Sequence, residues 1–151
     1  MTDRRSAAIH LFPLEASADI EEKGLATGTS AIFLASPPPL DDDTTVAAQM
    51  IASANEHGLD EPTDLGDWAI DAFDAERLLD RVPRPMSRGE RQICGLLVAL
   101  ARPFDAIYAV DPTAGLDANR RRAVVEVLTD LAVDNLVVCA SDDPLFATMS
   151  D

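Results

Sequence analysis

Residues 86–90, Met-Ser-Arg-Gly-Glu, have the types and spacing to bind a phosphate at the start of a helix. Ser87 and Glu90 have the S-x-x-E spacing of a capping box, in which the serine accepts from an early helix N–H and the glutamate reaches back. The amides of Gly89 and Glu90 are expected at a helix N-terminus, a place whose N–H groups and positive dipole end suit a phosphate. The same pair is also expected at any stable helix start, so a structural role alone stays open.

A second block follows a short apolar run. Residues 111–117 read Asp-Pro-Thr-Ala-Gly-Leu-Asp, directly after the buried-strand pattern of 106–110. Asp111 can cap the turn where the strand ends, and the Pro-Thr-Ala-Gly sequence after it is good turn chemistry. Asp117 is placed to cap a helix over 118–132. Each of these positions therefore has a structural explanation of its own.

Helical and strand patterns alternate along the chain. Short all-apolar runs predict buried strands, and apolar residues at helical spacing predict helices. The expected strands are 7–14, 31–35, 106–110 and 136–140, and the expected helical stretches are 44–57, 62–81, 88–101, 118–132 and 143–149. This alternation predicts an α/β fold with a mostly parallel sheet covered by helices. We expect one domain over 1–151, with a small helical subdomain at about 41–85.

Composition and charge exclude several classes of function. The net charge of −15 is too acidic for a nucleic-acid surface and would be repelled by anionic lipid head groups. No apolar run reaches the length of a membrane span, and no secretory signal is apparent, so we expect a cytoplasmic protein. Cys94 and Cys139 sit in apolar patterns and are expected to be core residues in a reducing compartment.

The two blocks, in this order and separation, resemble the C-terminal half of an ABC-type ATPase. Residues 86–90 stand where the family has its signature motif, Leu-Ser-Gly-Gly-Gln. Residues 106–111 stand at the Walker B strand, and 112–117 match the following Pro-Thr-x-x-Leu-Asp of the D-loop. The resemblance runs from Ala31 to about Ala147. It implies a P-loop-NTPase-like fold, here truncated, with the phosphate-loop portion reduced or missing.

The phosphate-binding loop of the family is not legible in this chain. ATP hydrolysis needs a Gly-rich loop whose lysine holds the β- and γ-phosphates, with the pattern G-x-x-x-x-G-K-[ST]. The nearest fragment, residues 24–30, is one residue short between its glycines and has Thr29 where the lysine belongs. Lys23, the only lysine of the chain, is on the wrong side of it. We expect a plain turn between strands there.

Other groups that act on a protomer's own nucleotide are also eroded. If Asp111 takes the place of the catalytic glutamate, Val110 occupies the magnesium-binding position; if Asp111 is the magnesium ligand, the glutamate is deleted. The glutamine of the Q-loop reads Ser36, and the switch histidine reads Asp142. The resemblance therefore predicts a degenerate domain with no catalytic residues, no metal site and no nucleotide bound by the chain itself.

The motifs that act on a neighbour's nucleotide are better preserved. In a head-to-tail ABC dimer, the signature loop and D-loop of one protomer close over ATP held by the other. The resemblance thus implies that a partner's ATP and Mg²⁺ contact Ser87, Arg88, Gly89, Glu90 and Asp117. The partner would be a competent ABC ATPase subunit or an ABC transporter complex. Arg88 replaces the first signature glycine, and it either adds a contact to phosphate or holds the loop away.

Two other functions are open from the sequence. The chain could be an interaction or regulatory protein that keeps the ABC scaffold and uses no nucleotide. An active enzyme of another kind is less favoured, because no nucleophile–base–acid set or metal cluster is visible; His10 and His57 lack spaced ligands. Asp41–Asp43 is expected to be a solvated loop or helix lead-in. For Arg120–Arg122, pairing with acids of the same chain is favoured over contact with an acidic partner.

Overall fold

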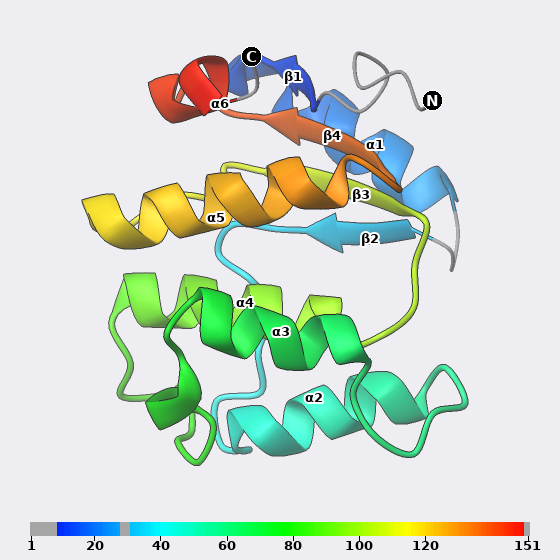
Figure 1. The fold of residues 1–151 in the computed structure, drawn as a ribbon, viewed down its shortest axis with the longest axis vertical. Helices are drawn as coiled ribbons and strands as arrows, with labels where there is room; N and C mark the ends of the chain where they lie inside the picture. The colour runs from blue at the N-terminus through cyan, green and yellow to red at the C-terminus, as the bar shows by residue number, and fades with distance from the viewer. Residues whose placement is uncertain (1–8, 28–30, 150–151) are drawn as a thin grey trace. The chain divides into compact units, whose positions relative to one another are not determined.

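The computed structural model describes residues 9–27 and 31–149, and its sheet is wholly parallel there. The strands run in the order β1-β4-β3-β2 (Figure 1), with bounds His10–Phe12 for β1, Ala31–Leu34 for β2, Ala106–Val110 for β3 and Leu136–Ala140 for β4. Tyr108 of β3 lies opposite Phe33 of β2 and Val138 of β4. The expected α/β class with a parallel sheet is confirmed, because buried parallel strands are apolar on both faces.

The chain divides into two compact units. The sheet unit comprises residues 1–36, 104–114 and 118–151, and the helical unit comprises residues 37–103 with 115–117. The helical region expected at about 41–85 therefore lies inside a larger unit, which also contains the signature motif. The tripeptide 115–117 belongs to the helical unit although it is far from it in sequence.

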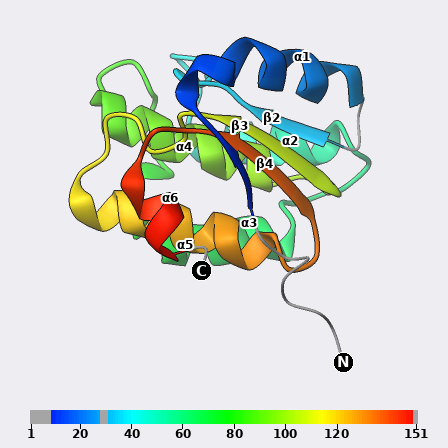
Figure 2. The ribbon, with the colours of Figure 1, turned by 90° about the horizontal axis from the view of Figure 1, so that it is seen from above.

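Helices cover both faces of the sheet within the sheet unit. Helix α1, Ser17–Thr27, lies on one face, and α5, Ala118–Leu131, with α6, Pro144–Met149, lies on the other (Figure 2). On the α1 side, Ile20 packs with residues of β3 and β4, namely Tyr108, Val110, Val138 and Ala140. Helix α5 buries Val124, Val125, Val127, Leu128 and Leu131. These apolar contacts are the main stabilising element of the unit.

The prediction of a turn at residues 24–30 is wrong for the first part of that segment. Residues 24–27 form the end of α1, while 28–30 lie outside the described residues. Gly24 is buried, and a β-carbon there would lie 2.9 Å from Cβ of Tyr108. The glycine thus allows α1 to approach β3 closely, which is a packing role and not a phosphate-binding one.

The helical unit contains three α-helices and one short 3₁₀ turn in its described residues. They are α2, Val46–Asn55, α3, Asp64–Ala72, the turn η3, Glu76–Leu78, and α4, Arg88–Leu100. Thr45 caps α2 and Thr63 caps α3 through their hydroxyl oxygens, as threonine does at helix starts. The core combines Val46, Met50, Ala69, Phe73, Leu78, Ile93, Leu97 and Leu100.

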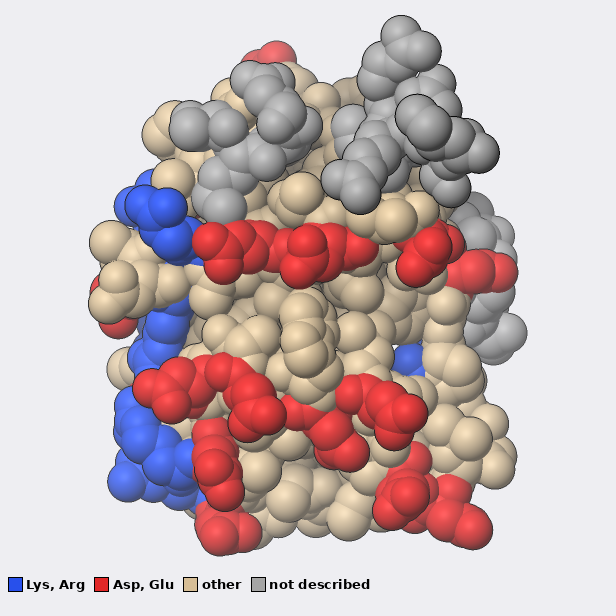
Figure 3. Space-filling view, viewed as in Figure 1, with Lys and Arg blue, Asp and Glu red and all other residues tan. Residues whose placement is uncertain are grey.

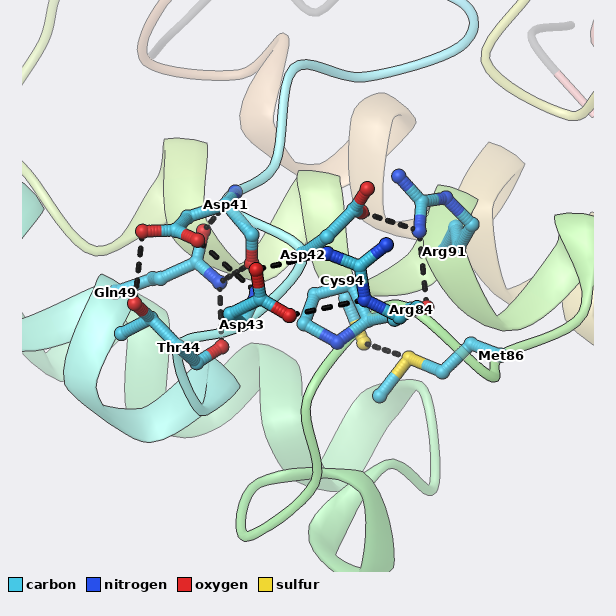
Figure 4. Close-up of polar contacts among 10 residues, drawn as sticks. Asp41, Asp42, Asp43, Thr44, Gln49, Arg84, Met86, Arg91 and Cys94 are labelled. Carbon is cyan, nitrogen blue, oxygen red and sulfur yellow. Dashed lines mark hydrogen bonds and ion pairs between the residues drawn. The ribbon is translucent and has the colours of Figure 1, made fainter.

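The loop before α2 is held to the segment around α4 at several points. A β-carbon on Gly95 would lie 2.2 Å from Cβ of Pro38, so the proline run packs directly on α4. Arg84 donates two hydrogen bonds to Asp43, and Arg91 pairs with Asp42 at 2.8 Å (Figure 4). The Asp41–Asp43 segment, expected to be a solvated loop or a helix lead-in, does lead into α2, but it is also ion-paired.

The Asp41 side chain closes this loop upon itself. Its carboxylate accepts from the N–H of Asp43 at 3.0 Å and from the Thr44 hydroxyl at 2.8 Å, and these two bonds lower the pKa of Asp41. Gln49 of α2 bonds back to the same residues, accepting from the N–H of Asp41 and donating to its carbonyl (Figure 4). The loop therefore enters α2 in one defined conformation.

Candidate functional site

The expected capping box at the start of α4 is present. The Ser87 Oγ accepts from the N–H of Glu90 at 3.1 Å, and the Glu90 carboxylate accepts from the N–H of Ser87 at 3.1 Å. Glu90 also pairs with Arg77 of η3 at 3.4 Å. The Glu90 carboxylate is thus used in contacts that stabilise the fold. The Ser87 hydroxyl accepts one hydrogen bond and still has its own hydrogen to donate.

The signature segment and residues 115–117 of the D-loop meet inside the helical unit. Gly89 is buried, and a β-carbon there would lie 2.7 Å from the carbonyl oxygen of Gly115. Gly115 has a φ of +76°, a conformation that favours glycine. Ser87, Arg88 and Asp117 are exposed. The structure therefore brings together the two motifs that the sequence placed far apart.

Arg88 lies across the D-loop. A β-carbon on Gly115 would meet the Arg88 Cγ and Cδ at 3.1 Å each, so the aliphatic part of the arginine rests on the glycine backbone. This packing fixes the stem of the side chain while the residue as a whole stays exposed. Arg88 is thus an ordered part of the surface formed by these two motifs.

The place for a phosphate-binding loop is the turn between β1 and α1. A P-loop joins a strand to the following helix, and this chain makes that connection at 13–16, not at 24–30. The turn contains Pro13, which has no N–H to offer, and the 3₁₀ turn η2, Leu14–Ala16. The N–H of Leu14 donates to the Asp142 carboxylate at 3.0 Å. The connection has neither glycine nor lysine.

The Walker B positions lie at the end of β3. Val110 packs against the apolar cluster around Ile20, and Asp111 is the first residue beyond the strand. Asp111 has a φ of +48°, and its N–H donates to the carbonyl of Ala140 at 2.8 Å. A positive φ is unusual for a residue other than glycine. The chain therefore turns sharply here and aims the backbone of Asp111 at the neighbouring strand.

Asp143 is the centre of a polar cluster that the sequence analysis missed. Its carboxylate accepts two hydrogen bonds from Arg121 of α5, at 2.8 and 3.0 Å, and one from the Thr113 hydroxyl at 2.8 Å. It also accepts from the N–H of Leu145 at the start of α6. Pairing with Arg121 is the main reason that the pKa of Asp143 falls to about 2. The favoured pairing of Arg121 with an acid of the same chain is thus present.

Asp142, at the expected position of the switch histidine, and its neighbour Asp143 differ in exposure and in the contacts of their side chains. Asp142 is exposed and holds the turn after β1, whereas Asp143, one residue later, has a side chain that is only 8% exposed.

Burial raises the pKa of the nearby Cys139 thiol to about 12, which keeps it protonated and unreactive. In the described ranges, no group of three or more His, Cys, Asp or Glu is arranged to hold a metal ion. None of the helices described is long and apolar enough to span a bilayer.

Comparisons with known proteins place these features in context. No family model matches the chain. It is 36% identical over 114 residues to the phosphonates import ATP-binding protein PhnC 2 of Albidiferax ferrireducens, a match that covers 68% of this chain and 41% of that protein. The chain thus spans less than half the length of this curated relative.

Two solved structures share the fold. The ATP-binding subunit of an ABC transporter superposes with a TM-score of 0.72 at 18% identity, over 89% of this chain and 68% of that one. A dimeric ATP-binding cassette in a post-hydrolysis state, bound to ADP and Pi, superposes with a TM-score of 0.66 at 19% identity, over 85% and 59%. At such identities the likeness establishes the fold alone.

Proposed function

Because this chain belongs to the ABC-type ATPase family, we propose that it is a non-catalytic partner of a competent ABC ATPase. In this role its signature segment and D-loop close over ATP and Mg²⁺ held by the other subunit. The contacting residues are Ser87, Arg88 and Gly89 at the start of α4, with Glu90 shaping the loop and Asp117 completing it from the D-loop.

One observation carries this proposal. Gly89 packs on the carbonyl of Gly115, so the signature segment and residues 115–117 of the D-loop belong to a single compact unit and present Ser87, Arg88 and Asp117 to solvent. The start of α4 presents the positive end of the helix dipole, which favours a phosphate. In the helical unit, Arg88 and Arg91 lie on α4, and arginines 77, 81 and 84 lie in the preceding segment that begins at η3.

The proposed lack of hydrolysis by the chain itself is supported by the turn between β1 and α1. A triphosphate there would find no glycine-rich backbone and no lysine, but Glu15 and Asp142 instead. Two carboxylates at this turn would repel a phosphate. Loss of a general base alone typically lowers a rate by about 10²–10⁴-fold.

A second function is favoured by one feature of the same surface. Arg88 lies on Gly115, and the Glu90 carboxylate is committed to the Ser87 N–H and Arg77, so part of the surface is already filled by the chain's own side chains. This packing suits an interaction or regulatory protein on an ABC scaffold that uses no nucleotide. The two functions differ in whether the association with a partner depends on ATP.

Substituting Ser87 distinguishes them. Asp and Asn are both good N-cap residues, so Ser87→Asp and Ser87→Asn should each keep the stability within about 0.5 kcal/mol of the wild type. We expect Ser87→Asp to abolish association in ATP and Mg²⁺, because its charge repels the partner's phosphate, and Ser87→Asn to retain most of it. The measurement is affinity capture of ABC ATPase subunits from the native host, with and without ATP. Equal capture by all three proteins without nucleotide would instead support the regulatory function.

A further inference from the structure

Helix α3 presents a tryptophan among carboxylates on its exposed side. Asp64, Asp67, Trp68 and Asp71 follow the i, i+3, i+4, i+7 spacing that places side chains on one helical face. All four are exposed, and Trp68 is 43% exposed. We call these four residues the α3 face. Tryptophan is enriched at protein interfaces, so an exposed tryptophan favours an interaction surface when its surroundings are complementary to a partner.

The orientation of this face is fixed by packing on the other side of α3. Ala69 is fully buried, and a β-carbon on Gly66 would lie 3.1 Å from Cα of Ala101, just after α4. Thr63 ties the start of the helix to the same place, since its hydroxyl donates to the carbonyl of Leu100 at 2.9 Å. Rotating α3 to bury Trp68 would bring Asp67 and Asp71 toward the apolar core. The tryptophan is therefore held in solvent by the fold.

The charged side chains of the α3 face itself all have one sign. Residues 24–76 contain no lysine or arginine, and exposed Asp60 and Glu61 precede α3 in the adjoining loop. Figure 3 shows a band of carboxylates over α3. Within the described residues, no ion pair forms to Asp64, Asp67 or Asp71.

We propose that the α3 face binds a cationic segment of a partner protein, with an arginine or lysine placed over the Trp68 ring and flanked by the three carboxylates. Tryptophan is the strongest aromatic partner of such cations, and Trp and Arg are enriched where interfaces gain most of their affinity. A second copy of this chain would bring like charges together on a protein of net charge −15. The proposal involves neither the signature segment nor a nucleotide, so it goes beyond the proposed function.

The fluorescence of Trp68 reports whether a ligand occupies the α3 face, because Trp68 is the only tryptophan of the chain. The probe is an amphipathic peptide of arginine and leucine, with a peptide of glutamate and leucine as its control. We expect the arginine peptide to shift the emission of Trp68 to shorter wavelength, saturably and at one peptide per chain, and the glutamate peptide to leave it unchanged. Added salt should weaken binding, since the contacts are between exposed charges.

Two triple variants separate this face from general acidity. D64N/D67N/D71N removes three charges from the α3 face, and E126Q/D130N/D134N removes three exposed charges at α5 and just after it. We expect the first to weaken peptide binding about tenfold, because each exposed contact contributes a factor of about five or less, and the second to change it less than about twofold. Calorimetry with Trp68→Ala should show a loss of at least similar size.

Three results would overturn the proposal. They are equal weakening by the two triple variants, binding of the glutamate peptide as tight as that of the arginine peptide, and no saturable emission change at millimolar peptide. An emission shift that follows protein concentration without any peptide would assign the face to self-association instead. Circular dichroism of each variant checks that the helices are intact.

Discussion

Gly89→Ala is expected to lower the free energy of unfolding by about 1–3 kcal/mol and to abolish ATP-dependent association with a partner. The added β-carbon would lie 2.7 Å from the Gly115 carbonyl oxygen, which is backbone and cannot rotate away as a flexible side chain can. Either α4 or the D-loop must shift, and the shift separates the two motifs that form the proposed contact surface. Denaturant unfolding measures the first effect and affinity capture measures the second.

The control for this substitution is an alanine at an exposed helical position. Glu126→Ala on α5 places the same residue in a helix without an obstruction, so its free energy of unfolding should stay within about 0.5 kcal/mol of the wild type. Because alanine is favoured over glycine in a helix by about 1 kcal/mol, an increase in the stability of Gly89→Ala would mean that no close contact exists. That result would remove the main support for a combined signature and D-loop surface.

Asp143→Asn is expected to destabilise the protein by about 1–2 kcal/mol at pH 7, because the bidentate bond with Arg121 loses its charge. The pKa of Asp143 is about 2 in the folded protein, below its ordinary value near 3.8. A carboxyl group whose pKa is lower in the folded than in the unfolded protein stabilises the fold at pH values above its unfolded-state pKa. This contribution disappears as the pH falls through its folded-state pKa. The wild type and Asp143→Asn should therefore converge in stability between about pH 4 and pH 2.

Denaturant unfolding at a series of pH values measures this convergence. Asp130→Asn, at an exposed position of α5, serves as the control and should track the wild type at every pH. A constant difference in the free energy of unfolding between wild type and Asp143→Asn down to pH 2 would show that the contact with Arg121 does not depend on the charge of Asp143. The cluster of Thr113, Arg121 and Asp143 would then be held together by packing alone.

The strands and the signature helix could be predicted from sequence because local signals agreed with their final surroundings. Residues 106–110 and 136–140 are strands with the expected bounds, since a strand buried on both faces needs apolar residues throughout. Helix α4 starts at Arg88 because the capping box fixes its first turn. These signals lie within a few residues of one another and need no tertiary information.

Helix α1 was not predicted because its sequence is weakly amphipathic. Ile20 is its one large side chain described as buried, and Gly24 argues against a helix by propensity. The helix forms because that glycine allows close packing on Tyr108, which is a tertiary effect. Because α1 was not predicted, the nearest match to a phosphate loop was placed at 24–30, whereas the strand-to-helix turn is at 13–16. The Phe-Pro sequence at 12–13 marked the end of β1 and was the signal available.

The contacts of the candidate site were the least predictable part. Thr113, Arg121 and Asp143 come from three separate segments, and spacing alone does not reveal that they meet. A local clue did exist, since Asp143 followed by Pro144 is a common way to begin a helix. The packing of Gly89 on Gly115 had no such clue. Sequence identified the two motifs, and only the fold shows that the signature segment and residues 115–117 share one compact unit.

Equilibrium titration of the isolated chain with ATP and Mg²⁺, followed by calorimetry and by release of phosphate, tests the account most directly. With Pro13 in place of a glycine-rich loop and Asp142 bonded to the same turn, we expect no saturable binding below about 1 mM and no turnover. Micromolar binding accompanied by phosphate release would contradict the account, because the chain would then hold and hydrolyse a nucleotide of its own.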